Sequence, residues 1–271
     1  MIYTVQGKPL YAYTGGKIFD PAKPTAVFIH GVLNDHSVWI LQTRYFAHHG
    51  WNVLAIDLPG HGRSGGNAPV SVEEAATCIG PLLDAAGVQK AVLVGHSFGS
   101  LIALHAAAQL PDRVAQLVLV GTAYPMRVSP ALLESSLNSP QKAIHMVNIF
   151  SHATLAPPPS ALGPGTWLLG GSKALMRRVL ASNPHENIFH IGFKACDQYD
   201  QAEVAMAKVV CPTLFLLGRK DQMTPPKAAQ SLIKMATNGQ VVLVNAGHQL
   251  MVEAPEETLN ALIAFCQTTA G

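Results

Sequence analysis

The sequence predicts an α/β fold: a mostly parallel sheet flanked by helices, with a helical insertion between two of its strands. Short apolar runs recur along the chain, helix-like segments separate most of them, and this alternation is interrupted once. The runs are nearly continuously apolar, which is typical of parallel strands buried on both faces. They span residues 26–30, 53–57, 91–95, 114–120, 213–217 and 241–245.

The N-terminal residues predict a β-hairpin. Two short strand-like segments, at residues 2–5 and 10–13, flank a turn that begins at Gly7. After the first apolar run, residues 38–49 have helical periodicity and end before Gly50, a residue type that commonly terminates helices. Along the chain, the hairpin therefore precedes the first strand of the predicted parallel sheet, and this helix follows it.

Two more helices have clear start signals. Ser71 and Glu74 form a capping box, and we expect the helix that they open to stop at Gly87. Pro255 opens the last helix, and the two acidic residues after it suit the positive end of the helix dipole. Strands and helices that alternate at this spacing indicate βαβ units and hence a mostly parallel sheet.

The alternation fails between residues 122 and 207, where helix-like runs such as 172–181 occur but no good strand does. We therefore expect a helical cap or lid at 122–207, inserted into an α/β core made of residues 1–121 and 208–271. A disordered linker is the alternative interpretation. Disordered segments are poor in aromatic residues, whereas this one contains Phe150, Trp167, Phe189 and Phe193.

Composition limits the classes of partner. The 271 residues are 49% hydrophobic and 13% charged, and the formal net charge is +2. No Lys/Arg run or basic helix face occurs, so neither nucleic acid nor an anionic membrane is an expected partner. No apolar stretch reaches the roughly 20 residues that span a bilayer, and the first residues lack the features of a signal peptide. We therefore expect a cytoplasmic protein without a transmembrane segment.

No pattern in the sequence indicates a metal or another cofactor. The cysteines form no Cys-x-x-Cys pair and no cluster with histidine at the spacing of zinc ligands, so we expect buried free thiols. They are Cys78, Cys196, Cys211 and Cys266. The segment from Gly60 to Gly65 fits Gly-x-Gly-x-x-Gly, but a dinucleotide site requires that motif to open directly into a helix. Here the helix start signal comes only at Ser71.

Ser97 is the predicted nucleophile. The motif Gly95-His96-Ser97-Phe98-Gly99 follows an apolar strand and precedes a helical run at 101–110. In that context Gly-x-Ser-x-Gly forms a sharp strand-to-helix turn, the nucleophile elbow, which leaves the serine hydroxyl exposed. Glycine at the flanking positions lets the strand and the helix approach each other closely.

A serine hydroxyl needs a base, and the base needs a carboxylate that fixes its tautomer. Of the 12 histidines, His248 lies in the loop just after the last apolar run, where parallel sheets place their chemistry. Asp221 directly follows the apolar run at 213–217. The order Ser97, Asp221, His248 is that of the Gly-x-Ser-x-Gly hydrolases. Rival carboxylates that follow no strand so directly are Asp200, Glu203 and Glu253.

Four motifs, in their order and spacing, resemble those of the α/β-hydrolase superfamily over nearly the whole chain. They are His30-Gly31, the segment from Asp57 to Ser64, the elbow at Ser97 and Gly247-His248. The resemblance implies an eight-stranded, mostly parallel sheet with a helical lid after the sixth strand. It also implies an oxyanion hole formed by two backbone N–H groups, those of Val32 and Phe98, which would stabilise a developing alkoxide.

The walls of the substrate pocket are predicted less directly. The candidates are residues that follow the early His-Gly motif and apolar residues of the lid. We expect this lid to be mobile over Ser97. The candidate residues are Leu33, Asn34, His36, Phe150 and Met176.

The triad and the oxyanion hole predict acyl transfer to water through an acyl-enzyme, with a small-molecule substrate. Hydrolysis of a carboxylic ester with a small to medium apolar acyl group, a carboxylesterase activity, is the leading hypothesis. Alternatives on the same scaffold are thioester, lactone or amide hydrolysis, perhydrolysis and C–C bond hydrolysis. The Gly-Pro-Gly element usual in C–C hydrolases is replaced here by Val32-Leu33-Asn34. A non-catalytic ligand-binding protein of the same fold is the alternative from another class, and a homodimer is not distinguished from a monomer.

Overall fold

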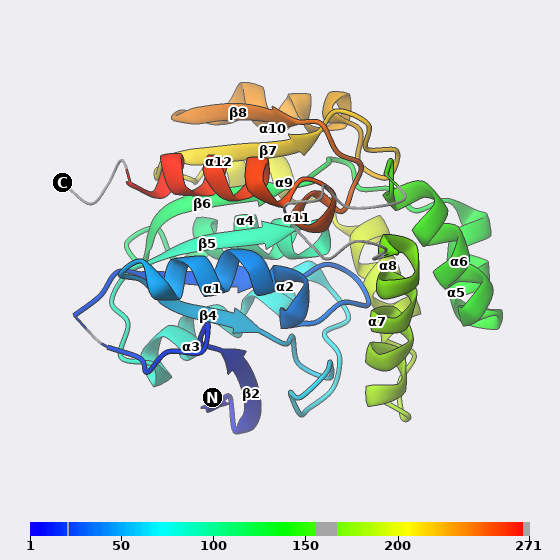
Figure 1. The fold of residues 1–271 in the computed structure, drawn as a ribbon, viewed down its shortest axis with the longest axis horizontal. Coiled ribbons are helices and arrows are strands. Elements are labelled where there is room, and N and C mark those ends of the chain that lie inside the picture. Colours follow the sequence, from blue (N-terminus) through cyan, green and yellow to red (C-terminus); the bar gives the residue numbers. More distant parts are fainter. Residues whose placement is uncertain (21, 155–166, 268–271) are drawn as a thin grey trace.

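The computed structural model describes residues 1–20, 22–154 and 167–267. These residues form one eight-stranded sheet in the order β1-β2-β4-β3-β5-β6-β7-β8 (Figure 1). The strands are β1 Ile2–Val5, β2 Lys8–Tyr13, β3 Thr25–Ile29, β4 Asn52–Ile56, β5 Ala91–His96, β6 Val114–Val120, β7 Thr213–Gly218 and β8 Gly239–Val244. Each neighbouring pair from β4 through β8 is parallel, whereas β1 and β2 pair antiparallel. The predicted mostly parallel, eight-stranded sheet is confirmed.

The N-terminal hairpin has a two-residue turn. Val5 pairs with Lys8, and both turn residues, Gln6 and Gly7, have positive φ angles of 49° and 75°. Positive φ at both central positions is characteristic of the type I′ turn, whose twist matches that of the strands. The second strand therefore begins two residues earlier than predicted, at Lys8, and it joins the hairpin to the main sheet by pairing antiparallel with β4.

Helices cover both faces of the sheet, and successive residues of its strands pack into two different clusters. In β3, Val27 and Ile29 belong to one buried cluster, whereas Ala26 and Phe28 belong to the other. The first cluster includes α2 Val72–Ala76, α3 Ile79–Ala85, α4 Phe98–Gln109, α9 Ala202–Met206 and α10 Gln230–Met235. The second includes α1 Ile40–His48, α11 Leu250–Glu253 and α12 Pro255–Gln267, and Figure 1 shows α1 and α12 on one face of the sheet.

The helix expected between Ser71 and Gly87 is divided in two. Ser71 does cap α2, since its hydroxyl accepts the N–H of Glu74 at 3.1 Å. The helix is interrupted after Ala76 and resumes as α3 at Ile79. Pro81 explains the interruption, because it has no N–H to donate to the carbonyl of the fourth residue before it.

The described part of the expected insertion, residues 122–207, is helical, and its helices other than α9 lie at the C-terminal edge of the parallel strands (Figure 1). Besides α9, it contains α5 Pro130–Asn138, α6 Pro140–Ser151, α7 Leu168–Ser182 and α8 Ile188–Gln198. Its own core includes Ile144, Met176 and Phe189, and this core also takes in Leu33 from the loop after β3.

Polar contacts fasten α7 and the loop after it to the core domain. Arg178 forms a 2.7 Å ion pair with Asp35. Ser182 accepts the N–H of Gly62 at 3.0 Å, and Glu186 accepts the N–H of Ala68 at 2.8 Å. On the α7 side, therefore, the insertion is held by directional bonds as well as by apolar packing.

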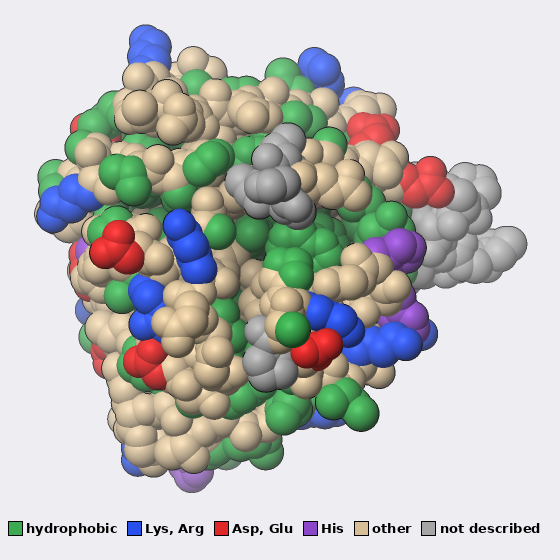
Figure 2. Space-filling view, turned by 90° about the vertical axis from the view of Figure 1, so that its left-hand side faces the viewer, with side chains coloured by type: hydrophobic (Ala, Val, Ile, Leu, Met, Phe, Trp, Pro, Cys, Tyr) green, Lys and Arg blue, Asp and Glu red, His purple; other side chains and the backbone are tan. Residues whose placement is uncertain are grey.

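The face at the far end of the sheet from the insertion carries Lys and Arg side chains interspersed with Asp and Glu (Figure 2). The coloured part of this face thus shows no block of a single charge of the kind that binds nucleic acid. None of the described helices is long and apolar enough to cross a bilayer. No disulfide joins the cysteines of the described residues, and all of them except the half-buried Cys211 are buried.

Candidate active site

Ser97 lies in a strained turn between β5 and α4. Its φ and ψ angles are 54° and −119°, a region that residues with side chains rarely occupy. A Cβ atom at Gly95 would overlap the carbonyl oxygen of Gly99, and one at Gly99 would overlap the carbonyl oxygen of Ile29. Glycine is therefore required at both positions, because the strand, the turn and β3 come together here at backbone distance.

The strained turn is held by bonds on both sides of Ser97. Its N–H donates to the carbonyl of Val120 in β6 at 2.9 Å, and its carbonyl accepts the Ser100 hydroxyl at 2.6 Å. The Ser97 side chain itself is partly exposed between buried neighbours. The turn thus presents a hydroxyl to solvent at the start of a helix, where the helix dipole favours negative charge.

Ser97 and His248 line the same cavity, which has a volume of about 270 Å³. Its other walls are mainly apolar and come from the loop after β3, from the insertion and from the loop after β7. They are Val32, Met126, Arg127, Val128, Ser129, Leu132, Phe150, Phe193, Cys196, Gln222, Met223 and Thr224. This volume lies just below the usual range for drug-sized ligands.

Asp221 and His248 are joined by a hydrogen bond from the ring. His248 Nδ1 lies 2.8 Å from Asp221 Oδ2, and both residues are buried. Burial alone would raise the pKa of Asp221, but the charge of His248 and hydrogen bonds from His248 and Thr224 outweigh it and lower the pKa to about 2. Asp221 is therefore ionised at neutral pH and orients the imidazole ring of His248 through Nδ1.

Part of the chain matches a known family model, and several curated proteins are similar to it in sequence. A model of the alpha/beta hydrolase fold matches residues 24–151. Lipase LipV of Mycobacterium tuberculosis is 41% identical over 108 residues, which make up 39% of this chain and 40% of that protein. Protein ABHD8 of Bos taurus is 29% identical over 244 residues, 87% of this chain and 54% of that protein. The chain thus spans about half of these curated relatives or less.

Solved structures show the same fold over the whole chain. An esterase from Exiguobacterium antarcticum superposes with a TM-score of 0.82 at 18% sequence identity, over 98% of either chain. The chain therefore has the α/β-hydrolase fold. The match to the family model includes Ser97 and ends before Asp221 and His248. The assignment of Asp221 and His248 therefore rests on their hydrogen bond and on the cavity that His248 shares with Ser97.

The two residues predicted as oxyanion donors, Phe98 and Val32, both lie close to Ser97. Phe98 is the first residue of α4, and the first N–H groups of a helix have no acceptor within it. Val32 lines the cavity. A Cβ at Gly31, just before it, would lie 3.1 Å from the Ser97 Cβ. The loop after β3 therefore passes directly beside the serine.

Thr224 also belongs to the site, although none of the sequence motifs includes it. Its hydroxyl lies 2.7 Å from Asp221 Oδ2, 3.0 Å from His248 Nδ1 and 2.9 Å from the carbonyl of Gly121. The backbone N–H groups of Met223 and Thr224 both donate to Asp221 Oδ1 at 2.8 Å. An Asp followed three residues later by Thr is the local signal, since Asp side chains commonly accept N–H groups two and three residues onward.

His96 is hydrogen-bonded to the backbone of His248. Its Nε2 donates to the carbonyl of His248 at 2.9 Å, and the two rings lie 4.7 Å apart. Burial, and then the charge of His248, lower the pKa of His96 to about 3. His96 is therefore a neutral ring that holds the backbone of His248 in place.

Phe150 is the one of the five predicted pocket residues that lies on the described walls of the cavity. Leu33 and Met176 are instead buried in the core of the insertion, where Met176 Sδ accepts the amide of Asn148 at 3.3 Å. Asn34 is also buried, and its amide donates to the carbonyl of Val32 at 3.3 Å. These three predictions are corrected: the side chains face other protein atoms and not the cavity.

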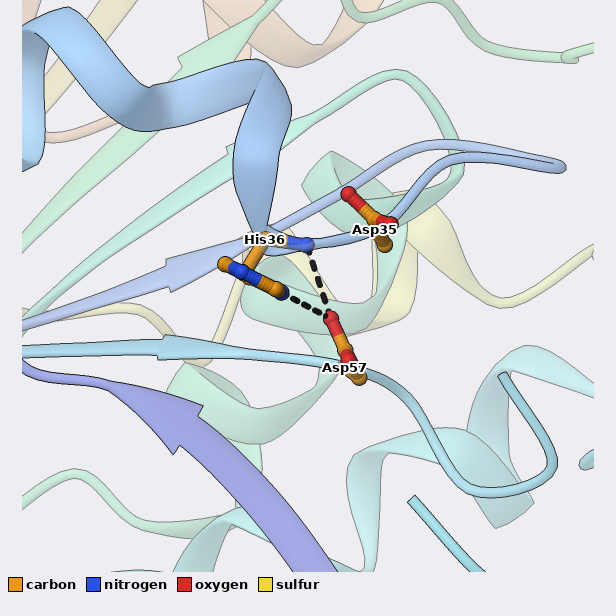
Figure 3. A group of neighbouring side chains, drawn as sticks. All are labelled: Asp35, His36 and Asp57. Carbon is orange, nitrogen blue, oxygen red and sulfur yellow. Dashed lines mark hydrogen bonds and ion pairs between the residues drawn. The ribbon is translucent and has the colours of Figure 1, made fainter. Parts of the chain in front are cut away.

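His36 is not on the described walls of the cavity either, and its ring points toward Asp57 (Figure 3). Its N–H and its ring Nδ1 both contact Asp57 Oδ1, at 2.8 and 2.7 Å. Asp57 Oδ2 in turn accepts the N–H of Arg63 at 2.9 Å. The pair therefore braces the loop after β4 against the loop after β3, and the assignment of His36 to the substrate pocket is corrected.

One group of described side chains could supply metal ligands, because its ligand atoms all lie within 4.8 Å of one another (Figure 3). It consists of Asp35, His36 and Asp57. The carboxylate oxygens of Asp35 and Asp57 already accept hydrogen bonds from protein donors. Asp35 accepts Ser37 on one oxygen and the Arg178 guanidinium on the other, and Asp57 is engaged as described above. An arginine beside the cluster also opposes a cation. The chemistry of this donor set therefore suits a polar brace and not a metal site.

The rival carboxylates do not reach the imidazole of His248. Asp200 and Glu203 are exposed. Glu253 is buried close to His248 in sequence, but its oxygens accept backbone N–H groups. Of the carboxylates considered from the sequence, Asp221 is the one bonded to the ring.

Proposed function

We propose that this α/β hydrolase is a serine esterase that cleaves a carboxylic ester with a small to medium apolar acyl group. Ser97 is the nucleophile, His248 the base and Asp221 the residue that orients the base. The observation that carries the proposal is the 2.8 Å bond between His248 Nδ1 and Asp221 Oδ2 beside the cavity on which Ser97 lies. A hydrogen-bonded Asp-His pair serves to activate a serine only where a serine shares the site.

The tautomer of His248 follows from this bond. Because Nδ1 donates its proton to ionised Asp221, Nε2 is left with a lone pair and accepts the proton of the Ser97 hydroxyl during attack. The carboxylate then stabilises the imidazolium, which returns the proton to the leaving alcohol. Water repeats the sequence on the acyl-enzyme. The N–H groups of Phe98 and Val32 are the proposed donors to the oxyanion, and no step needs a metal or a cofactor.

The walls of the cavity support an apolar acyl group. Phe150, Phe193 and Leu132 face it from the insertion, and Met223 faces it from the loop after β7. The volume of about 270 Å³ leaves room for a short or medium chain. Two proteins to which this chain is similar, lipase LipV and the esterase from Exiguobacterium antarcticum, are consistent with an ester substrate.

The function is tested with p-nitrophenyl esters from acetate to laurate, with lactone and thioester panels in parallel. A fluorophosphonate probe, followed by peptide mass spectrometry, should label Ser97. Preferred turnover of a lactone or a thioester would replace the ester proposal while keeping the triad. Absence of both turnover and labelling would instead favour a ligand-binding protein.

Acid should lower kcat/KM with the slope of a single ionisation. His248 must be neutral to accept the Ser97 proton, so activity falls as acid protonates it. Asp221 adds no second step near neutral pH, because its pKa is lowered to about 2. The measurement is a plot of log kcat/KM against pH for the best ester, over the range in which the protein stays folded. A slope of two on the acid limb would contradict the assignment.

Phe150→Asp should weaken the preference for longer acyl chains. Each methylene transferred to an apolar wall contributes about 0.8 kcal/mol, roughly a fourfold gain in kcat/KM, until the cavity is full. A charged wall removes that gain. The matched control is Ile149→Asp. Ile149 precedes Phe150 on α6 and is similarly exposed, at 51% against 47%. Only Phe150 lies on the described walls of the cavity. Equal chain-length profiles for the two variants would contradict the proposal that α6 contacts the acyl group.

A further inference from the structure

The C-terminal end of α6 is bonded directly to the loop that carries His248. The carbonyl of Ser151, the last residue of α6, accepts the N–H of His248 at 2.8 Å and that of Gln249 at 3.3 Å. A Cβ at Gly247 would lie only 2.8 Å from the N of Ala153. The insertion and the proposed base therefore touch at backbone distance.

The side chain of Glu253 also joins the end of α6 to the His248 loop, because it accepts N–H groups from both segments. Its Oε2 accepts the N–H groups of Ala153 and Thr154 at 2.7 and 2.9 Å. Its Oε1 accepts those of Gly247 and Gln249 at 3.1 and 3.3 Å. One oxygen thus serves the insertion and the other serves the His248 loop, two segments about a hundred residues apart in the sequence.

The carboxylate of Glu253 is buried, which is unfavourable for a charged group. The residue is 3% exposed, and none of the ion pairs in the described part of the chain includes it. A buried carboxylate without a cation is destabilising unless hydrogen bonds stabilise it. Here backbone N–H groups supply them. A cap for the short helix α11 would account for the two bonds to its own loop, but not for the two bonds to the insertion.

The same end of α6 also forms a wall of the cavity, because Phe150 immediately precedes Ser151. We propose that Glu253 is a positioning residue that couples the insertion to the base: its carboxylate holds the end of α6 and the His248 loop as one unit. What the coupling does for catalysis rests on the proposed function, since His248 acts as the base only there. The coupling itself requires no turnover.

Hydrogen exchange of the full chain tests the coupling without a substrate. Glu253→Gln replaces one acceptor oxygen with an amide that must face N–H donors, so one of the two segments loses its bonds. Peptides covering residues 151–154 and 247–249 should both exchange about tenfold faster. The elbow peptide, residues 91–109, should keep its wild-type rate. The control Glu256→Gln makes the same change at an exposed site in the next helix and should leave both segments unchanged.

A second variant introduces the change on the insertion side only. Ala153→Pro removes one donor to Glu253, and His152 already has the extended backbone, φ −114° and ψ 128°, that precedes proline readily. Faster exchange at residues 247–249 in this variant shows that a disturbance of the insertion reaches the His248 loop. In both variants kcat, and the labelling rate with a saturating fluorophosphonate, should fall about tenfold while KM changes less.

Three outcomes would overturn the proposal. Exchange could rise uniformly, including the elbow peptide, which would indicate only a loss of global stability. Ala153→Pro could leave residues 247–249 unchanged, which would show that the two segments open independently. Exchange could rise in both segments with kcat and labelling unchanged, which would reduce Glu253 to a structural role. If the wild-type chain itself neither turns over esters nor labels, the proposed function fails, and the exchange results still decide the coupling.

Discussion

Ser97→Ala should lower kcat for the best ester about a millionfold and leave the protein folded. The members of a serine triad act as a unit, so loss of the nucleophile removes nearly all of their contribution. The folded state should tolerate the change, because the Ser97 side chain is partly exposed and the bonds that hold the turn come from its backbone. Alanine also accepts the strained φ of 54° at about the same cost as serine.

The measurement pairs kcat with the thermal midpoint of unfolding, which should change by no more than a few degrees. Ser139→Ala is the matched control, since Ser139 is exposed at the junction of α5 and α6. It should retain wild-type turnover. A Ser97→Ala protein that is folded and keeps more than about one-hundredth of the activity would remove Ser97 from the nucleophile role.

Local sequence signals predict the elements that depend on neighbours in the chain. A continuous apolar run followed by Gly-x-Ser-x-Gly and a helical run predicts the turn at Ser97, because each requirement lies within a few residues. The same holds for strands β3 to β7, where continuous apolar runs reflect burial on both faces. The edge strand β8 has a similar apolar run but is largely exposed. Local sequence signals are less accurate where a break depends on one residue inside a helix, as with Pro81 of α3, which separates α3 from α2.

Residues whose role depends on distant partners are not predictable in this way. An apolar stripe identifies the face of α7 that is buried, but not whether that face meets the cavity or another helix. Met176 meets Asn148 of α6. Thr224 acts through a carboxylate and a ring that only the fold brings together. Glu253 is noticeable in the sequence only as a rival to Asp221, because its partners at Ala153 and Thr154 are remote.

Asp221→Asn should lower kcat about ten-thousandfold, because it reverses the tautomer of His248. The asparagine oxygen can keep the N–H groups of Met223 and Thr224, which Asp221 Oδ1 accepts at 2.8 Å. The amide NH₂ then replaces Oδ2 and becomes a donor opposite His248 Nδ1. Two donors cannot face each other, so the ring carries its proton on Nε2 and cannot accept the proton of Ser97.

The acid stability of the same variant provides a second measurement. The pKa of Asp221 is lowered to about 2 from an ordinary value of 3.8, so its ionised form stabilises the fold above about pH 4, and this contribution is lost as the pH falls toward 2. The asparagine variant should lack that step. Asp200→Asn, a change at an exposed rival carboxylate, is the matched control and should retain both the wild-type kcat and the acid step. If Asp200→Asn loses activity and Asp221→Asn does not, the orienting carboxylate has been misassigned.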